Sequence, residues 1–182
     1  MKLMIASDIH GSFFYCEKLL EALNKEKADK LLLLGDILYH GPRNDLPEGY
    51  APKKVIDALN GIKESILAVR GNCDTEVDQM VLEFPILADY CIIQCENKTI
   101  YATHGHVYGE ASPLPMAKGS ILLGGHTHIP KCKEYDNFIY MNPGSVSIPK
   151  ENSHHGYMIY ENGIFYWKDF SGSIINSYKI NG

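Results

Sequence analysis

The chain has 182 residues, of which 45% are hydrophobic and 21% charged, and this balance excludes a collagen-like, low-complexity or disordered protein. Its net charge of −5 argues against non-specific binding to nucleic acid or to an acidic membrane surface. No stretch approaches the roughly 20 apolar residues of a membrane span or the roughly 7–15 of a secretory leader, so we expect a cytoplasmic protein and no membrane partner.

The first part of the chain alternates between short apolar runs and segments whose apolar residues recur at helical spacing. The apolar runs predict buried strands, and the helical spacing predicts amphipathic helices. In chain order we expect a strand at 2–7, a helix at 12–23, a strand at 30–34, a loop at 37–50, a helix at 51–59 and a strand at 65–69. This order is typical of right-handed crossovers onto a mostly parallel sheet.

The second part of the chain has the pattern of hairpins. Its expected strands are 90–95 and 99–103, 131–135 and 138–141, and 157–160 and 164–167, with one more at 121–123. Turn residues separate the members of each pair at 96–98, 136–137 and 161–163, and the Asn-Gly step at 162–163 is the strongest of these turn signals. We therefore predict a single α/β domain over residues 1–182, with two packed sheets whose later strands are mainly antiparallel.

Five short polar motifs directly follow predicted strands. They are Asp8-Ile9-His10, Gly35-Asp36, Gly71-Asn72-Cys73-Asp74, His104-Gly105-His106 and Gly125-His126-Thr127-His128. Each motif alone is weak, since Gly-Asp and Gly-Asn are common turn pairs and His-x-His suits an ordinary strand. Ligands collect at the carboxyl ends of strands in α/β sheets, so the joint occurrence of five such motifs predicts one shared crevice.

Seven side chains of these motifs suit divalent metal ions. The candidate ligands are Asp8, His10, Asp36, Asn72, His104, His126 and His128. If Asp36 bridges two ions, each ion receives four protein ligands. Mixed carboxylate, imidazole and amide ligation suits Mn²⁺, Fe, Zn²⁺ or Co²⁺, and the five cysteines form no C-x-x-C pair that would make a thiolate site.

The predicted chemistry is hydrolysis of a phosphate ester. Two ions roughly 3.5–4 Å apart can share a bridging hydroxide, because binding to a metal lowers the pKa of water towards about 7. The same ions neutralise charge on the phosphoryl oxygens during an in-line displacement. A helix that begins near Gly11-Ser12 is expected to add anion-binding N–H groups.

These motifs, in this order, resemble the calcineurin-like metallophosphoesterases. Within that superfamily, the short length and three segments resemble the small prokaryotic YfcE-type phosphodiesterase branch; the segments are Thr103-His104-Gly105-His106, Gly124-Gly125-His126-Thr127-His128 and Asn142-Pro143-Gly144-Ser145. The stretch from Gly35 to Pro52 fits the same branch, so the resemblance covers nearly the whole chain.

The resemblance implies a fold, a metal content and a division of the ligands. The implied fold is a four-layer αββα sandwich of two mixed β-sheets flanked by helices. One metal is implied at Asp8, His10 and His128 and the other at Asn72, His104 and His126, with Asp36 shared. Mn²⁺ is the metal most used by such enzymes, although the fold also accepts Zn²⁺, Fe, Co²⁺ or Ni²⁺.

The chain departs from the superfamily pattern at one position. The superfamily usually has His after Gly-Asn, where it helps to protonate the leaving group, and this chain has Cys73. The thiol of Cys73 is one candidate proton donor, and His106, beside His104, is another. It is equally open that Cys73 is inert or an accessory metal ligand, and that His106 supports a ligand. The candidate catalytic residues are therefore Asp36, Asn72, Cys73 and His106.

The loop that leaves Asp36 is the candidate substrate-binding segment. Its Arg43 has the geometry for a bidentate contact with phosphate oxygens, and His40 is expected to hydrogen-bond the substrate or the attacking water. The alternative is a surface loop with a solvated arginine.

The leading hypothesis is a metal-dependent phosphodiesterase acting on a small phosphodiester. A phosphomonoesterase with the same site is the nearest alternative, and an interaction scaffold of the same fold is a second, disfavoured because all seven ligands are present. A nuclease is disfavoured by the acidic charge, so nucleic acid is an unlikely partner. Exposed strand edges suggest a homodimer or homotetramer.

Overall fold

The apolar run at the start of the chain forms strand β1 (Leu3–Ala6), which is buried on both of its faces. The structure is a computed structural model and describes residues 1–95 and 98–180. Side chains of a strand alternate between its faces. Leu3 and Ile5 accordingly belong to one hydrophobic cluster, and Met4 and Ala6 belong to another. β1 therefore lies between two apolar layers, which explains why its sequence has no polar alternation.

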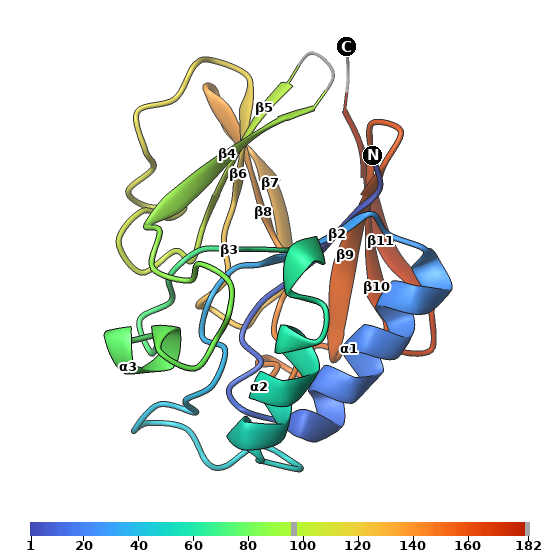
Figure 1. Cartoon of the computed structure of the whole chain (residues 1–182). Coiled ribbons are helices and arrows are strands. Elements are labelled where there is room, and N and C mark those ends of the chain that lie inside the picture. The colour runs from blue at the N-terminus through green and yellow to red at the C-terminus, as the bar shows by residue number, and fades with distance from the viewer. Residues whose placement is uncertain (96–97, 181–182) are drawn as a thin grey trace.

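A six-stranded mixed sheet contains β1 near its centre (Figure 1). Its strands, in spatial order, are β11 (Ile174–Lys179), β10 (Ile164–Asp169), β9 (Gly156–Glu161), β1, β2 (Lys30–Leu33) and β3 (Ile66–Ala68). β1, β2 and β3 run parallel, as the crossover pattern predicts, whereas β9, β10 and β11 are joined by antiparallel pairing.

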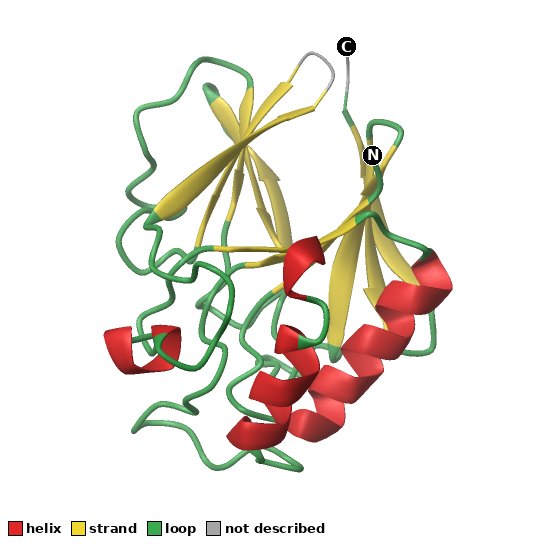
Figure 2. Cartoon of the chain, viewed as in Figure 1, coloured by secondary structure: helices red, strands yellow, loops and turns green. Residues whose placement is uncertain are grey.

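Helices cover the outer face of this sheet (Figure 2). α1 (Phe13–Glu26) and α2 (Pro52–Asn60) lie side by side, and the buried side chains of α1, such as Cys16 and Leu19, share a cluster with Met4 of β1. A 3₁₀ turn, η1 (Lys63–Ser65), precedes β3. Within the described part of the chain, no helix combines the length and the apolar character that crossing a bilayer requires.

A five-stranded sheet packs on the inner face of the first. Its strands, in spatial order, are β4 (Tyr90–Cys95), β5 (Lys98–Thr103), β6 (Ser120–Leu123), β8 (Phe138–Asn142) and β7 (Lys131–Glu134). β5 pairs with β6, and β6 with β8, in parallel, so the expectation of mainly antiparallel later strands is wrong for the centre of this sheet. Long excursions separate these strands in the chain, which permits parallel pairing. Residues 96–97 of the predicted turn at 96–98 lie outside the described residues.

The two mixed sheets form the predicted α/β sandwich, but its outer layers differ. Met116, in the connection between β5 and β6, packs on Leu122, Phe138 and Tyr140, which face outward from the second sheet. Among the described residues, this face is therefore covered by a connecting segment, whereas the first sheet is covered by α1 and α2.

Besides the 3₁₀ turn η1, two elements were not expected from the sequence. The first is α3 (Glu76–Gln79), although Thr75 and Asp78 form a capping box, a pattern that predicts the start of a helix. The second is β11, whose residues are mostly exposed and show no buried alternation. Neither element buries a regular series of apolar side chains, so the apolar periodicity that predicts the other elements is absent from them.

Glu26, at the end of α1, joins the helix to the first sheet. Its carboxylate accepts hydrogen bonds from Lys168 Nζ at 2.5 Å and Tyr157 Oη at 3.2 Å, and Lys2 Nζ lies 3.1 Å away. Burial raises the pKa of Glu26, but Lys168 and Lys2 outweigh it and bring the pKa below its ordinary value of 4.5. A depressed carboxylate pKa contributes stability that is present above the ordinary pKa and is lost as the pH falls through the lowered one.

Glu26→Gln is therefore expected to lower the free energy of unfolding by about 1–2 kcal/mol at pH 7, because a charge-assisted contact is lost. The difference from the wild type should shrink as the pH falls through the lowered pKa of Glu26, because its carboxyl group then becomes neutral like the amide of Gln. Urea unfolding at pH 7 and at a series of pH values below 4.5 measures both effects, with exposed Glu21→Gln of the same helix as the control. A difference that does not change with pH would contradict this account.

Candidate metal centre

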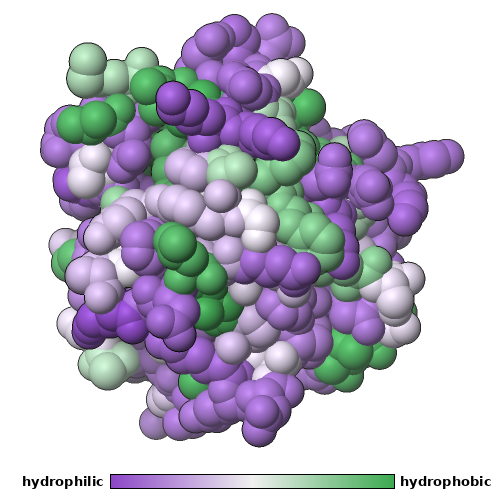
Figure 3. Space-filling model, turned by 90° about the horizontal axis from the view of Figure 1, so that it is seen from below, coloured by the Kyte–Doolittle hydropathy of each residue, from purple (hydrophilic) through white to green (hydrophobic). Residues whose placement is uncertain are grey.

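The five polar motifs meet at one end of the sandwich. β1, β2 and β3 of the first sheet end there, and so do the parallel strands β5 and β6 of the second. The connections that follow β1 and β2 lie in the lower part of Figure 1. Seen from this side, the surface is largely hydrophilic, with separate hydrophobic patches (Figure 3). The topology thus places all the candidate ligands between the ends of the two sheets.

The backbone turns sharply at most of the candidate ligands. Positive φ angles, which are uncommon outside glycine, occur at Asp8 (60°), His10 (49°), Asp36 (55°), His126 (65°) and His128 (62°). Such conformations cost on the order of 1–3 kcal/mol each and persist only where surrounding structure enforces them. Here they direct side chains from separate strand ends towards a common centre.

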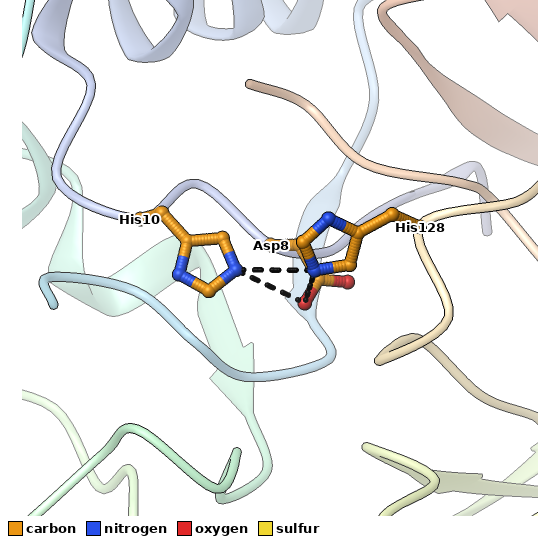
Figure 4. A group of neighbouring side chains, drawn as sticks. All are labelled: Asp8, His10 and His128. Carbon is orange, nitrogen blue, oxygen red and sulfur yellow. Dashed lines mark hydrogen bonds and ion pairs between the residues drawn. The ribbon is translucent and has the colours of Figure 1, made fainter. Parts of the chain in front are cut away.

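Asp8, His10 and His128 form the first group of candidate ligands (Figure 4). Asp8 Oδ1 lies 3.2 Å from His128 Nε2 and 3.5 Å from His10 Nε2, and the two Nε2 atoms are 3.2 Å apart. Asp8 is fully buried, and within the described chain its Oδ1 has no hydrogen-bond partner other than these two imidazoles. A carboxylate oxygen buried in this way is stabilised by positive charge, either on the imidazoles or on a bound cation.

Asp36 lies between this group and the second. Its Oδ2 is 3.5 Å from His104 Nε2 and 3.7 Å from His10 Nε2, and its Oδ1 accepts the Cys73 backbone N–H at 2.8 Å. Asn72 Oδ1 lies 3.1 Å from His104 Nε2. The position of Oδ2 is the one that a carboxylate shared by two ions would need.

Three imidazoles are oriented by the protein backbone. The Nδ1 atoms of His10, His104 and His128 each lie 2.7 Å from a carbonyl oxygen, of Tyr39, Leu34 and Ile148 respectively. A carbonyl only accepts, so each Nδ1 carries a proton, and an imidazole that is neutral presents the lone pair of its Nε2 to the carboxylates. That arrangement is repulsive alone and favourable around a metal ion, as in metal-bound histidines generally.

The electrostatics of the centre favour positive charge. Burial raises the pKa of Asp8, but His10 and His128 outweigh it and hold that pKa well below its usual range. Burial lowers the pKa of His104, but Asp36 and Asp8 outweigh this and raise it to about 9. The donor set, the buried oxygen of Asp8 and the Nε2 atoms that face the carboxylates together fit divalent ions of the kind that take mixed oxygen and nitrogen ligands.

His126 sits at the open side of the centre. Its ring centroid is 5.1 Å from that of His104, and its backbone N–H donates to Asp8 Oδ2 at 3.1 Å. Burial and the neighbouring His104 lower the pKa of His126, which keeps this imidazole neutral and able to bind a metal. All seven candidate ligands are thus brought to one place.

Glycine and small polar residues allow this close assembly. A Cβ on Gly71 would lie 2.2 Å from Asp36 Oδ1, so only glycine fits at this crossing. The Ser145 and Ser147 hydroxyls donate to the carbonyl of Asp8 at 2.9 and 3.1 Å, and Asn142 Nδ2 donates to the Gly125 carbonyl at 2.7 Å.

A cleft of about 460 Å³ opens onto the centre, and Arg43, Asn44, Cys73 and Lys150 contribute to its walls together with several candidate ligands. Arg43 thus lies in the cleft where its predicted contact with substrate would be made. His40 does not line this cleft and its ring packs edge-on against Tyr50, and its contact with substrate stays a prediction.

The sequence analysis missed Asn44 and Lys150. Asn44 belongs to the loop already singled out and donates to the His40 carbonyl at 2.8 Å. Lys150 is remote in sequence and enters the cleft because its backbone N–H binds the His128 carbonyl at 3.1 Å. No local signal marks that contact.

Two other expectations change. His106 is exposed, with its ring 5.3 Å from that of His104, and it lies outside the cleft walls that Cys73 helps to form. The start of α1 is not an open anion site, because the Phe13 N–H binds the Gly49 carbonyl and the Tyr15 N–H binds the Ser12 hydroxyl. The returning loop satisfies the first of these groups, and the capping residue Ser12 satisfies the second.

Asp74 supports the centre from behind, where its carboxylate accepts the backbone N–H groups of Asp36 (2.8 Å), Ile37 (2.9 Å) and Gly71 (2.7 Å). Asp74→Asn replaces one accepting oxygen by an N–H donor, so we expect stability to fall by about 1–3 kcal/mol. The displaced Asp36 backbone should weaken Mn²⁺ binding by about 10-fold or more.

Urea unfolding and calorimetric Mn²⁺ titration measure the two effects of Asp74→Asn, and exposed Asp57→Asn on α2 is the matched control. Unchanged Mn²⁺ affinity in a destabilised variant would limit Asp74 to a role in folding.

Comparisons with known proteins agree with this geometry. Residues 1–162 match the calcineurin-like phosphoesterase superfamily domain. The chain is 46% identical over 164 residues to phosphodiesterase YfcE of Escherichia coli K12, covering 90% of this chain and 89% of that protein. The solved structure of YfcE, a phosphoesterase from E. coli, matches with a TM-score of 0.96 at 44% identity and covers all of both chains.

The fold itself extends further. Vps29 of Entamoeba histolytica, solved in complex with zinc, has a TM-score of 0.64 and 21% identity over the full length of both chains, a likeness that shows the fold alone. The match of the superfamily model to most of the chain, and the identity to YfcE, show that this protein belongs to the calcineurin-like phosphoesterase superfamily.

Proposed function

We propose that this protein is a metal-dependent phosphodiesterase that hydrolyses small phosphodiesters. The observation that carries the proposal is the position of Asp36 Oδ2 between His104 and His10, at 3.5 and 3.7 Å, inside a ring of further ligands. The similarity to a phosphodiesterase of E. coli supports a diester as the substrate. Residues 1–182 are proposed to act as one domain.

Two divalent ions are proposed, with Mn²⁺ as the preferred metal and Zn²⁺, Fe, Co²⁺ or Ni²⁺ as substitutes. Asp8, His10 and His128 would hold one ion, Asn72, His104 and His126 the other, and Asp36 both. When bound, such ions lower the pKa of water to supply a nucleophile and neutralise charge on the phosphoryl oxygens. The chain's own part is to fix their positions and to keep each imidazole oriented through its Nδ1 contact.

The cleft supplies the contacts to the substrate. Arg43 and Lys150 provide positive charge in its walls, and Asn44 provides an amide. During hydrolysis the water oxygen bonds to phosphorus as the bond to the departing alcohol breaks, and that alcohol must gain a proton. Cys73 stands in the cleft and is the proposed neighbour of the departing oxygen; Asn72 Nδ2 donates to its sulfur at 3.2 Å.

A phosphomonoesterase using the same centre is the main alternative, because the ligands do not distinguish the two reactions. An interaction scaffold is the other, since the same fold occurs in Vps29. We also propose a cytoplasmic location and a homodimer or homotetramer. The edge strands β4 and β11 expose large apolar residues, such as Ile92 and Ile174, which pairing between subunits would protect.

The first test compares bis-p-nitrophenyl phosphate with p-nitrophenyl phosphate on protein stripped of metal and resupplied with Mn²⁺, Mg²⁺, Zn²⁺ or none. We expect release from the diester with Mn²⁺, little from the monoester, and a loss of at least about 100-fold in Asp36→Ala, which lacks the shared ligand. Asp57→Ala is the control. Greater activity on the monoester would indicate a phosphatase, and tight Mn²⁺ binding without turnover would indicate the scaffold.

The second test concerns the proton for the leaving group. Cys73→Ala should slow cleavage of benzyl methyl phosphate, whose alcohol needs a proton, by about tenfold, and methyl p-nitrophenyl phosphate by less than about twofold. His106→Gln is expected to affect neither ester, because its ring lies outside the cleft. Chromatography of the released alcohols gives the rates. Equal losses on both esters in Cys73→Ala would rule out proton transfer from this thiol.

A further inference from the structure

A second hollow, of about 420 Å³, lies directly beside the metal cleft. Its walls come from the loop after β2, from α2 and from α3, and they are mostly apolar: Leu38, Tyr39, Ile56, Val77 and Val81 take part. In Figure 1 the loop between β2 and α2 runs between α2 and α3. We call this hollow the apolar groove.

The apolar groove and the metal cleft meet at one residue. Cys73 is part of the walls of both, and it follows the candidate ligand Asn72. Gly41 lies against the same sulfur, since a Cβ at this position would be 3.3 Å from Cys73 Sγ. A glycine at this position adds no side chain beside the thiol, where the two hollows come closest to each other.

The groove presents apolar surface that the fold itself does not cover. The exposed fractions are 69% for Val77, 42% for Val81 and 41% for Tyr39, which are high for side chains of this kind. Polar groups, Lys53, Thr75 and Asp78, stand among the apolar ones. A concave apolar surface with a few polar groups is typical of a site for a small organic group.

We propose that the apolar groove binds the departing alcohol of the substrate, and that this alcohol is an aryl or alkyl group. The proposal rests on the phosphodiesterase function proposed above and specifies its substrate class. The phosphoryl group would lie at the metal centre, the departing oxygen beside Cys73, and the hydrocarbon part against Ile56, Val77 and Val81. The other ester group would point away from the groove, towards the polar walls at Arg43 and Lys150.

The test keeps the chemistry of the leaving group constant and varies only its apolar surface. Methyl phenyl phosphate and methyl 4-butylphenyl phosphate release phenols of nearly equal pKa, so a difference in kcat/KM reports binding of the butyl chain. Each fully buried methylene is worth about a fourfold change, so partial burial of the chain should raise kcat/KM about tenfold with Mn²⁺. Butyl phenyl phosphate, with the chain on the other ester group, should match methyl phenyl phosphate.

The variants that test the groove change residues of the short segment from Val77 to Val81. Val77→Ser/Val81→Ser removes apolar wall from two largely exposed positions, so folding should be unaffected, and the tenfold preference should fall to less than about twofold. Met80→Ser is the matched control, because Met80 is 83% exposed on the same segment and is not part of the groove walls. It should keep the preference. Shifts of the Val77 and Val81 methyl resonances on addition of 4-butylphenyl phosphate should report occupation of the groove without turnover.

The outcomes separate the two proposals. Turnover of bis-p-nitrophenyl phosphate without any advantage of the butylphenyl ester, or with an advantage that survives in Val77→Ser/Val81→Ser, would overturn the groove assignment alone. A response to the chain on the other ester group would overturn it too. An oligomer that light scattering shows to dissociate in the double variant, with no chain-length effect in the wild type, would make the groove a contact between copies. Failure of every diester would remove both proposals.

Discussion

Two buried carboxylates, Asp8 and Asp36, impose the requirement on which the rest of the structure depends. A carboxylate taken out of water is strongly destabilised unless cations or hydrogen-bond donors surround it. Asp36 has the Cys73 N–H on one oxygen, but its Oδ2 and Asp8 Oδ1 face imidazole Nε2 atoms. Backbone carbonyls fix the opposite nitrogen of three of these imidazoles. The centre is thus arranged around positive charge, which bound metal ions would supply without protonating the imidazoles.

The packing of the two sheets offsets the free-energy cost of this arrangement. β1 is buried on both faces, between the helices and the second sheet, so the strand that carries Asp8 and His10 is held by two hydrophobic clusters. The left-handed backbone at five candidate ligands is strained by on the order of 1–3 kcal/mol each, which such packing can offset. Glycine at Gly71 then lets the third strand end approach Asp36 closely. Stability and site geometry therefore come from the same strands.

Under the proposals made above, the cleft and the apolar groove would divide the recognition of substrate between charge and hydrophobic surface. Arg43 and Lys150 place positive charge in the walls of the cleft, whereas α2 and α3 contribute to the walls of the apolar groove, which Cys73 also borders. The replacement of histidine by cysteine in this motif fits that division, because a thiol is small and apolar enough to border both. In this scheme Cys73 links the choice of leaving group to the metal centre.

The sequence by itself determined the strands that carry the motifs, the ligand types and the superfamily, because buried strands and the polar residues that follow them leave local patterns. The tertiary structure alone decided which residues share the site: Lys150 enters the cleft through a contact with the His128 carbonyl, and His40 turns towards Tyr50. It also decided the parallel pairing of β5, β6 and β8 and the covering of the outer face of the second sheet by the segment that contains Met116. These features depend on contacts between residues far apart in the chain, which hydrophobic periodicity does not encode.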